Sequence, residues 1–149
     1  MNKFTIPLQI RWSDIDANRH LRHSVYYDYG AFCRMELLTQ LGLSTRKLEE
    51  LGIGPILFRE EALFRREIVF EDRITINTEL VRASEDYSRW SIRHQITKED
   101  GSLAATINID GAWIDMNKRK LAVPDQFVQD VFAQAPKAED FSFIQKKKD

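Results

Sequence analysis

The sequence predicts an α+β fold in which an antiparallel sheet is wrapped around one long central helix. Residues 24–41 contain good helix formers and carry apolar side chains around most of the helix circumference. A helix that is apolar on nearly every side is buried, so another layer must cover it. Four alternating segments follow in succession, and consecutive strands joined by tight turns form an antiparallel sheet.

The first elements frame a polar loop. Residues 5–12 alternate between apolar and polar side chains, which predicts a half-buried strand. Residues 13–23 form the loop, and Ser24 is the expected N-cap of the long helix. Gly42 is placed to end that helix as its C′ residue. A short helix capped by Ser44 follows.

The second half of the chain is predicted to contain four strands and a terminal helix. Asp100-Gly101 is a tight-turn pair between two alternating segments, which predicts a hairpin. Glu60 and Arg66 interrupt the apolar face of the first of these strands, so a bulge is expected near them. Pro124 suits the first turn of the helix. The expected strands cover residues 56–70, 73–83, 87–97 and 103–115, and the helix covers residues 124–135.

Length and composition indicate one domain over residues 1–135 and a weakly ordered tail over residues 136–149. The net charge of −1 provides no field that would attract nucleic acid. No apolar run approaches the ~20 residues that a membrane helix needs. The single cysteine, Cys33, and an N-terminus without a long apolar segment favour a cytoplasmic protein.

The loop over residues 13–23 has the ligand types of a calcium site, but its pattern does not fit one. Asp14, Asp16 and Asn18 fall at positions 1, 3 and 5 of an EF-hand loop. Position 6 is then Arg19 where glycine is needed, and position 12 is Val25 where a bidentate glutamate is needed.

Three further interpretations of the loop remain. His20, His23 and a carboxylate could hold zinc, although the sequence offers no second cluster of ligands. Asp and Asn are also common in loops simply because their side chains bond to nearby backbone. Alternatively, the loop is catalytic, because free N–H groups at the start of the long helix favour developing negative charge. A carboxylate base beside such a helix end suits acyl transfer.

Several residues outside the loop are expected to serve the fold. His94, on the apolar parity of its strand, is expected to be a core histidine with satisfied hydrogen bonds. Cys33 is expected to pack in the core, and Arg34 and Glu36 to form a structural ion pair or solvent contacts. Gly30 lies within the long helix, where glycine costs ~1 kcal/mol relative to alanine, so it should mark a close approach of another group.

The run R-W-S-D-I-D-A-N-R-H-L-R-H-S-V-Y resembles the signature of hotdog-fold acyl-CoA thioesterases of the 4-hydroxybenzoyl-CoA thioesterase type. That signature is an alternating strand, then D-x-D-A-x-x-H or D-x-D-A-G-G, then a long helix that carries tyrosine. The resemblance extends over residues 5–125. Further matches are Arg34 and Glu36 in an A-R-x-E pattern, Gly42-Leu43 at the helix end, Glu61 and Phe64 in E-x-x-[YF], and Asp72 in an acidic turn.

The resemblance implies a hotdog fold, with the sheet wrapped around the helix over residues 24–41. Such domains pair through sheet edges as a homodimer or homotetramer, which also covers the exposed edges, and their active site lies at the dimer interface. The implied substrate is an acyl thioester, fatty or aromatic, of coenzyme A or acyl carrier protein. Coenzyme A enters only as part of the substrate. No metal or redox cofactor and no nucleic-acid or membrane partner is implied.

The resemblance also assigns roles within the loop. Asp16 matches the catalytic carboxylate, which acts as general base on water or as nucleophile. His23, seven positions on, would polarise the carbonyl or orient water, with the carbonyl directed at the helix N-terminus. A thioester needs no strong acid for its leaving group, because a thiol departs near its own pKa. One base and an oxyanion site can therefore suffice.

Two alternatives to hydrolysis remain open. Enoyl-thioester hydratases carry a D-x-N-P-x-H-like dyad, whereas Asp16 and His20 are four positions apart here with no proline between them. A non-catalytic acyl-binding or scaffold dimer is the other. Departures from the signature that bear on substrate preference are Arg19 in place of glycine, Arg22 in place of an aromatic residue or asparagine, and Ala31-Phe32 in place of an acidic residue.

Overall fold

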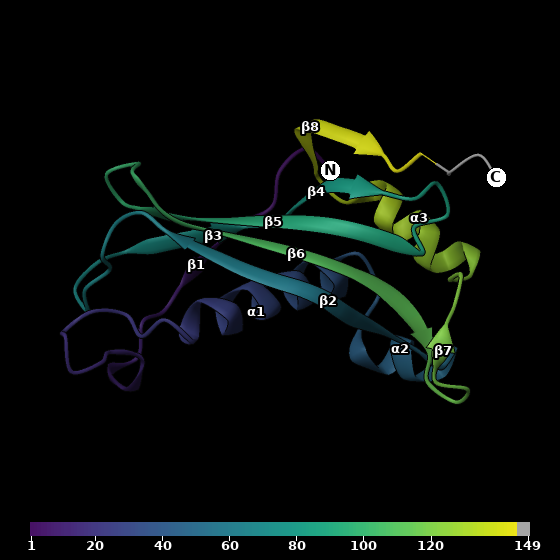
Figure 1. Ribbon diagram of the computed structural model, residues 1–149, viewed down its shortest axis with the longest axis horizontal. Coiled ribbons are helices and arrows are strands. Elements are labelled where there is room, and N and C mark those ends of the chain that lie inside the picture. Colours follow the sequence, from purple (N-terminus) through teal and green to yellow (C-terminus); the bar gives the residue numbers. More distant parts are fainter. Residues whose placement is uncertain (146–149) are drawn as a thin grey trace.

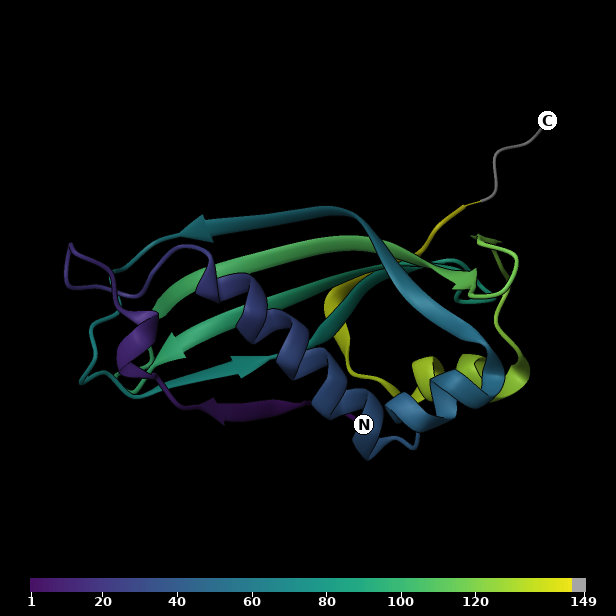
Figure 2. The same ribbon diagram turned by 90° about the horizontal axis from the view of Figure 1, so that it is seen from below.

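The computed structural model describes residues 1–145 as a curved sheet with helices α1 and α2 beneath one face (Figure 1). Helix α3 lies at the same end of the molecule as α2 (Figure 2). The helices are α1 (Val25–Gln40), α2 (Thr45–Leu51) and α3 (Gln126–Gln134), and a 3-10 turn spans Trp12–Asp14. The strands are β1 (Thr5–Leu8), β2 (Ile53–Phe64), β3 (Ile74–Asn77), β4 (Glu79–Ala83), β5 (Arg89–Lys98), β6 (Leu103–Asp115), β7 (Lys120–Leu121) and β8 (Lys137–Phe143).

The sheet is built around β5 and β6, which pair with each other along most of their length. Strand β6 also pairs with β2, which forms one edge of the sheet. Strands β3 and β4 lie along the other side of β5 and are separated at Thr78. Beyond them, β1 pairs with β3 and β8 pairs with β4. All of these pairs are antiparallel except β4–β8, so the predicted antiparallel sheet is confirmed.

Most of the predicted helix ends agree with the structure. Gly42 follows α1 with a φ of 95°, a conformation that glycine adopts without a steric cost. Ser44 caps α2 by accepting from the backbone N–H of its first turn. Ser24 occupies the predicted N-cap position of α1, but its side chain does not cap the helix, because its hydroxyl accepts from the Arg22 guanidinium instead. Helix α3 begins two residues later than predicted, because Asp125 is its N-cap.

Helix α1 is covered on one side only. Its sheet-facing side is buried, at Val25, Tyr26, Tyr29, Gly30, Cys33, Leu37 and Leu38. On the other side Ala31 and Glu36 are exposed, and Phe32 is 52% exposed. The expectation of a helix wrapped on all sides is therefore not confirmed for the single chain.

Several strand boundaries differ from the prediction. Strand β1 ends at Leu8, because the chain then turns into the 3-10 segment. Strand β2 covers residues 53–64 instead of 56–70, and its register shift lies between Leu57 and Arg59. The strand expected over residues 73–83 is divided into β3 and β4. Strand β6 has the predicted bounds, and Gly101 makes the turn before it with a φ of 87°.

The weak order predicted from residue 136 onward is wrong for residues 137–143, which form β8. The backbone N–H of Leu80 donates to the Pro136 carbonyl (2.8 Å), and the Arg93 guanidinium donates to Asp140 (3.0 Å). Residues 146–149 of the predicted tail lie outside the described residues. None of the helices within the described part is long and apolar enough to cross a membrane.

Gly30 marks a close approach of α1 to the sheet. A β-carbon there would lie 3.1 Å from the Cδ2 atom of His94 on β5 and 3.3 Å from the Arg34 guanidinium. Both distances are shorter than ordinary van der Waals contact, so the predicted close approach is confirmed.

We predict that Gly30→Leu destabilises the protein, because overpacking in a close contact costs roughly 1–3 kcal/mol. Urea unfolding measures the loss. Thr39→Leu, on the exposed side of the same helix, is the matched control and should stay within about 0.5 kcal/mol. Equal stability of the two variants would show that residue 30 does not hold the helix against the sheet.

Candidate functional site

A cleft of about 380 Å³ lies between the polar loop, the first turn of α1 and the end of β2. It contains three of the predicted loop side chains, those of Asp16, His20 and His23. Asp14 is not among its lining residues. The remaining wall is formed by Leu21, Tyr26, Phe64, Arg65, Arg66 and Glu67.

Asp14 holds the loop together from inside. Its carboxylate is fully buried and accepts from the backbone N–H of Arg11 (2.9 Å) and the hydroxyl of Tyr29 (3.1 Å). Burial works against the charged form, yet the hydrogen bonds from Arg11 and Tyr29 outweigh it and lower the pKa of Asp14. The Asp14 carbonyl also accepts from the backbone N–H of Arg22 (2.8 Å). Asp14 therefore joins the loop to α1 and does not face the cleft.

Asp16 sits in a tight turn at the edge of the cleft. One carboxylate oxygen, Oδ1, accepts from the backbone N–H of Asn18 (2.8 Å), and the Asp16 N–H donates to the His20 carbonyl (3.0 Å). Arg19 completes the turn with a φ of 71°, which explains why glycine suits this position in the signature. Within residues 1–145, no group donates to the second oxygen, Oδ2. That oxygen is available to water or substrate.

The other polar groups of the cleft surround Asp16. His23 is exposed, and the Nε2 atom of His20 lies 3.6 Å from the Glu67 carboxylate. Tyr26 was not predicted as a site residue, although the tyrosine in the signature was a signal for it. Burial, and then the charge of Asp16, raise the pKa of Tyr26 to about 12. Its phenol therefore stays protonated and can donate a hydrogen bond into the cleft.

The N-terminus of α1 has no side-chain cap, because Ser24 is turned toward Arg22. Backbone N–H groups of an uncapped first turn, together with the helix dipole, stabilise negative charge. The cleft thus combines a carboxylate base with donors that could hold an oxyanion. The part of the chain that the structure describes contains no cluster of three or more His, Cys, Asp or Glu side chains placed to bind a metal.

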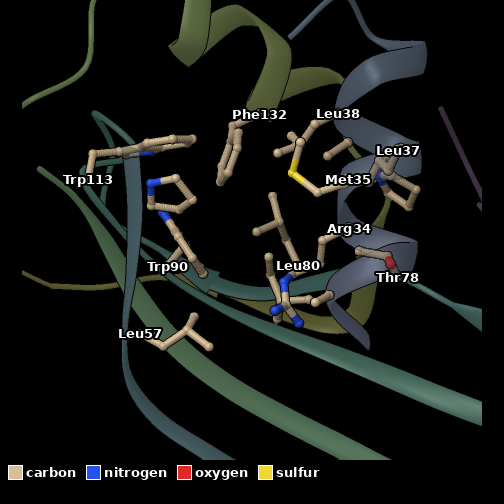
Figure 3. Close-up of a pocket in the computed structure, with 15 residues that line it drawn as sticks. Arg34, Met35, Leu37, Leu38, Leu57, Thr78, Leu80, Trp90, Trp113 and Phe132 are labelled. Carbon is tan, nitrogen blue, oxygen red and sulfur yellow. The ribbon is translucent and has the colours of Figure 1, made fainter. Parts of the chain in front are cut away.

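A second hollow, an apolar cavity of about 260 Å³, lies between α1, α3 and the sheet. Figure 3 shows Leu80, Trp90, Trp113 and Phe132 around it, with Arg34 extending from α1. None of its lining residues belongs to the loop over residues 13–23. The cavity is therefore separate from the Asp16 cleft within one chain.

Arg34 is held by a buried histidine and not by an acidic residue. Its guanidinium donates to Nε2 of His94 (3.0 Å), whose Nδ1 donates to the Asn77 carbonyl (2.8 Å). Two outcomes were expected for Arg34 and Glu36, an ion pair or solvent contacts. The ion pair is absent, since no ion pair within residues 1–145 includes Arg34, and Glu36 is exposed to solvent. The prediction of a satisfied core histidine is confirmed for His94.

The same network reaches Cys33 through Thr78. The Thr78 hydroxyl lies 3.1 Å from Nδ1 of His94 and donates to the sulfur of Cys33 (2.9 Å). Cys33 is fully buried, and its burial raises the pKa of the thiol to about 11. A thiol that stays protonated is a poor nucleophile, so the packing role predicted for Cys33 is confirmed.

The His94 environment predicts that stability falls in mild acid. Burial and the Arg34 charge lower the pKa of His94 to about 3, against 6.5 for a free imidazole. Between these values the unfolded chain binds the extra proton, so stability is lost as the pH falls below 6.5, by up to roughly 1.4 kcal/mol per pH unit.

Urea unfolding at ~pH 7.5 and ~pH 5 tests this dependence, because the window lies above the pKa values of most carboxylates. His94→Gln should flatten the dependence. His23→Gln, which removes an exposed imidazole, should keep it. A His94→Gln protein with an unchanged pH dependence would show that another group is responsible.

One family model matches most of the chain. The model of the thioesterase-like superfamily matches residues 10–132. A Staphylococcus aureus protein solved in complex with CoA has a TM-score of 0.81 and 20% identity, over 92% of this chain and 88% of that chain. No protein with a curated description matches the chain.

Two named enzymes have similar structures. A DHNA-CoA thioesterase from Staphylococcus aureus has a TM-score of 0.80 and 18% identity, over 90% of this chain and 91% of that chain. A 1,4-dihydroxy-2-naphthoyl-CoA thioesterase from Synechocystis has a TM-score of 0.79 and 20% identity, over 89% of this chain and 97% of that chain. At these identities the likeness establishes the fold.

Proposed function

This chain belongs to the thioesterase-like superfamily, and we propose that it hydrolyses the thioester of an acyl-coenzyme A or an acyl carrier protein. The observation that carries the proposal is the Asp16 carboxylate, with one oxygen available, in a cleft at the uncapped N-terminus of α1. The similar structures that are named as CoA thioesterases, or that were solved with CoA, support coenzyme A as the carrier.

In the proposed reaction, Oδ2 of Asp16 removes a proton from water while the water oxygen attacks the thioester carbon. The carbonyl oxygen becomes an oxyanion, which the first-turn N–H groups of α1 would stabilise. Collapse of the tetrahedral intermediate breaks the carbon–sulfur bond. The thiolate leaves and takes up a proton, and the acid remains. Direct attack by the Asp16 carboxylate, with later hydrolysis of the anhydride, uses the same geometry.

His23 and Tyr26 would assist this reaction as hydrogen-bonding groups. The Tyr26 phenol is protonated, so it can donate to the carbonyl oxygen or to the attacking water. His23 is exposed at the same cleft, where it can orient the water or polarise the carbonyl. Neither group must transfer a full proton, because the thiol leaving group needs no strong acid.

We predict that Asp16→Asn reduces kcat on any accepted acyl thioester by at least ~100-fold, because loss of a general base typically costs that much. Thiol release from acyl-CoA esters measures the rate. Asp28 is an exposed carboxylate at the same end of the helix, so Asp28→Asn should hydrolyse the thioester at close to the parental rate. Asp14→Asn should lose stability more than turnover. The loss of turnover in His23→Ala should be smaller than in Asp16→Asn but larger than in Asp14→Asn.

Two results would contradict this assignment. One is near-parental turnover by Asp16→Asn, combined with loss of turnover in folded Asp14→Asn or His20→Ala. The other is the absence of thiol release from every acyl-CoA and acyl carrier protein ester, which would favour a non-catalytic acyl-binding dimer. Product analysis after incubation with an enoyl-CoA distinguishes hydrolysis from hydration.

The proposed functional unit is a homodimer that pairs through β2. This strand is twelve residues long and pairs only with β6 within the described part of the chain. Large apolar side chains are exposed on it, with Phe58 and Phe64 each 55% exposed. A long apolar edge strand left open promotes association. Antiparallel pairing of two β2 strands would also cover the exposed side of α1.

The protein is expected to be a dimer or larger in light scattering at micromolar concentration. Phe58→Lys, near the middle of β2, should favour the monomer, because two such lysines would face each other at a twofold axis. Val123→Lys, at another exposed apolar position, should leave assembly unchanged. If the parental protein is monomeric under these conditions, both the proposed dimer and a shared active site are wrong.

A further inference from the structure

The apolar cavity beside α1 contains one positive charge without a counterion. Its lining residues are aliphatic or aromatic apart from Arg34 and Thr78. Arg34 makes its single hydrogen bond within residues 1–145 to His94, and no carboxylate in this part of the chain forms an ion pair with it. Glu60 acts on Arg34 only from a greater distance. A partly buried charge is costly unless it is paired, so the cavity favours an anion.

We propose that this cavity binds an amphipathic monocarboxylate, with the carboxylate on Arg34 and the apolar body against Leu80, Trp90 and Phe132. A cavity of ~150 Å³ can hold benzene, so about 260 Å³ has room for a substituted ring or a short acyl chain. The aromatic walls pack edge-to-face, with Trp113 and Phe132 ring centres 5.4 Å apart. Such walls give a flat apolar ligand a large contact area.

The guanidinium is prepared for a carboxylate by its one protein contact. Nδ1 of His94 donates to the Asn77 carbonyl, so Nε2 carries the lone pair that accepts from Arg34. His94 is neutral, so its Nε2 atom can accept from the guanidinium, and the positive charge of Arg34 stays unbalanced. The other N–H groups of Arg34 make no hydrogen bond within the described chain. A guanidinium presents them as a planar fork that matches the two oxygens of a carboxylate.

Two sources can supply this ligand. The acid that thioester hydrolysis releases is an apolar group ending in a carboxylate, and for this source the inference rests on the proposed function. The other source is a free acid that is not the product and acts as an effector. Both share the same chemistry, so binding and turnover are measured separately.

Tryptophan fluorescence measures binding without any need for turnover. Trp12 is 74% exposed, whereas Trp90 and Trp113 line the cavity, so Trp12→Phe leaves the reporters that face the ligand. Hexanoate and phenylacetate are titrated against hexanamide and phenylacetamide, which have the same shape without the charge. We expect each acid to bind at least ~10-fold more tightly than its amide, as a bidentate charged contact would give. Equal affinities for acid and amide in this otherwise unaltered protein overturn the proposal.

Substitution of Arg34 then assigns the preference to one side chain. Arg34→Met keeps the length and removes the charge, and it should bring the acid and amide affinities within about twofold of each other. Arg46→Met removes an exposed arginine on α2 and should keep the preference. Arg34→Lys keeps the charge but lacks the planar guanidinium that can contact both carboxylate oxygens. It replaces Arg34→Met in the test if the methionine variant does not fold. It should retain a smaller preference, and an unchanged preference in a folded Arg34 variant overturns the proposal.

Turnover of the matching acyl-CoA distinguishes the sources. Competitive inhibition by the acid, lost in Arg34→Met, identifies the cavity as the place where the released acid binds. A change in kcat without competition, lost in the same variant, identifies an effector. If no thioester is hydrolysed, the proposed function fails while the fluorescence titrations still decide whether the cavity binds a carboxylate.

Discussion

The contact between Gly30 and His94 determines how the long helix lies on the sheet. A β-carbon at position 30 would press on the imidazole at 3.1 Å, so the absence of a side chain sets the distance between the two layers. The same imidazole has both nitrogens engaged, by Arg34 and by the Asn77 carbonyl. Because a buried polar group must keep its partners, the helix can neither rotate nor rise without breaking that network. The Asp16 cleft at one end of α1 and the apolar cavity further along it both depend on this position.

Two carboxylates two residues apart, Asp14 and Asp16, have opposite environments. Asp14 is fully buried, and its carboxylate accepts hydrogen bonds from Arg11 and Tyr29, which ties the loop to α1. One carboxylate oxygen of Asp16 accepts a hydrogen bond within the turn, and the other is available at the cleft. The buried carboxylate makes the loop rigid, and a rigid loop holds the available carboxylate near the helix N-terminus. Catalytic groups need such support, because a misplacement of about 1 Å can cost a large factor in rate.

Local patterns in the sequence predicted the α+β class and the antiparallel sheet, and the similar structures confirm a hotdog-type fold. Gly42 and Ser44 mark helix ends by local chemistry, so they were predictable. The break at Thr78 was not, because it arises where Asn77 turns its carbonyl to a histidine on the neighbouring strand. Strand β8 was missed because its residues are mostly polar, and its place depends on distant contacts such as that between Arg93 and Asp140. The catalytic roles of Asp16 and His23 stay predictions.

The Arg34 charge could not be interpreted from sequence, because Arg34 and Glu36 were expected to form a structural ion pair or solvent contacts, while the fold turns Arg34 toward His94. Its position also bears on assembly. From the start of α1 to Arg34 is nine residues, or ~13.5 Å of helix, and the cavity shares no lining residue with the Asp16 cleft. In the proposed dimer, antiparallel β2 strands would place the end of one strand, with its cleft, beside the start of the other, where Pro55 and Leu57 line the second cavity. An acyl group in one subunit's cavity could then reach Asp16 of the other, which would give the long edge strand a role in the chemistry as well as in assembly.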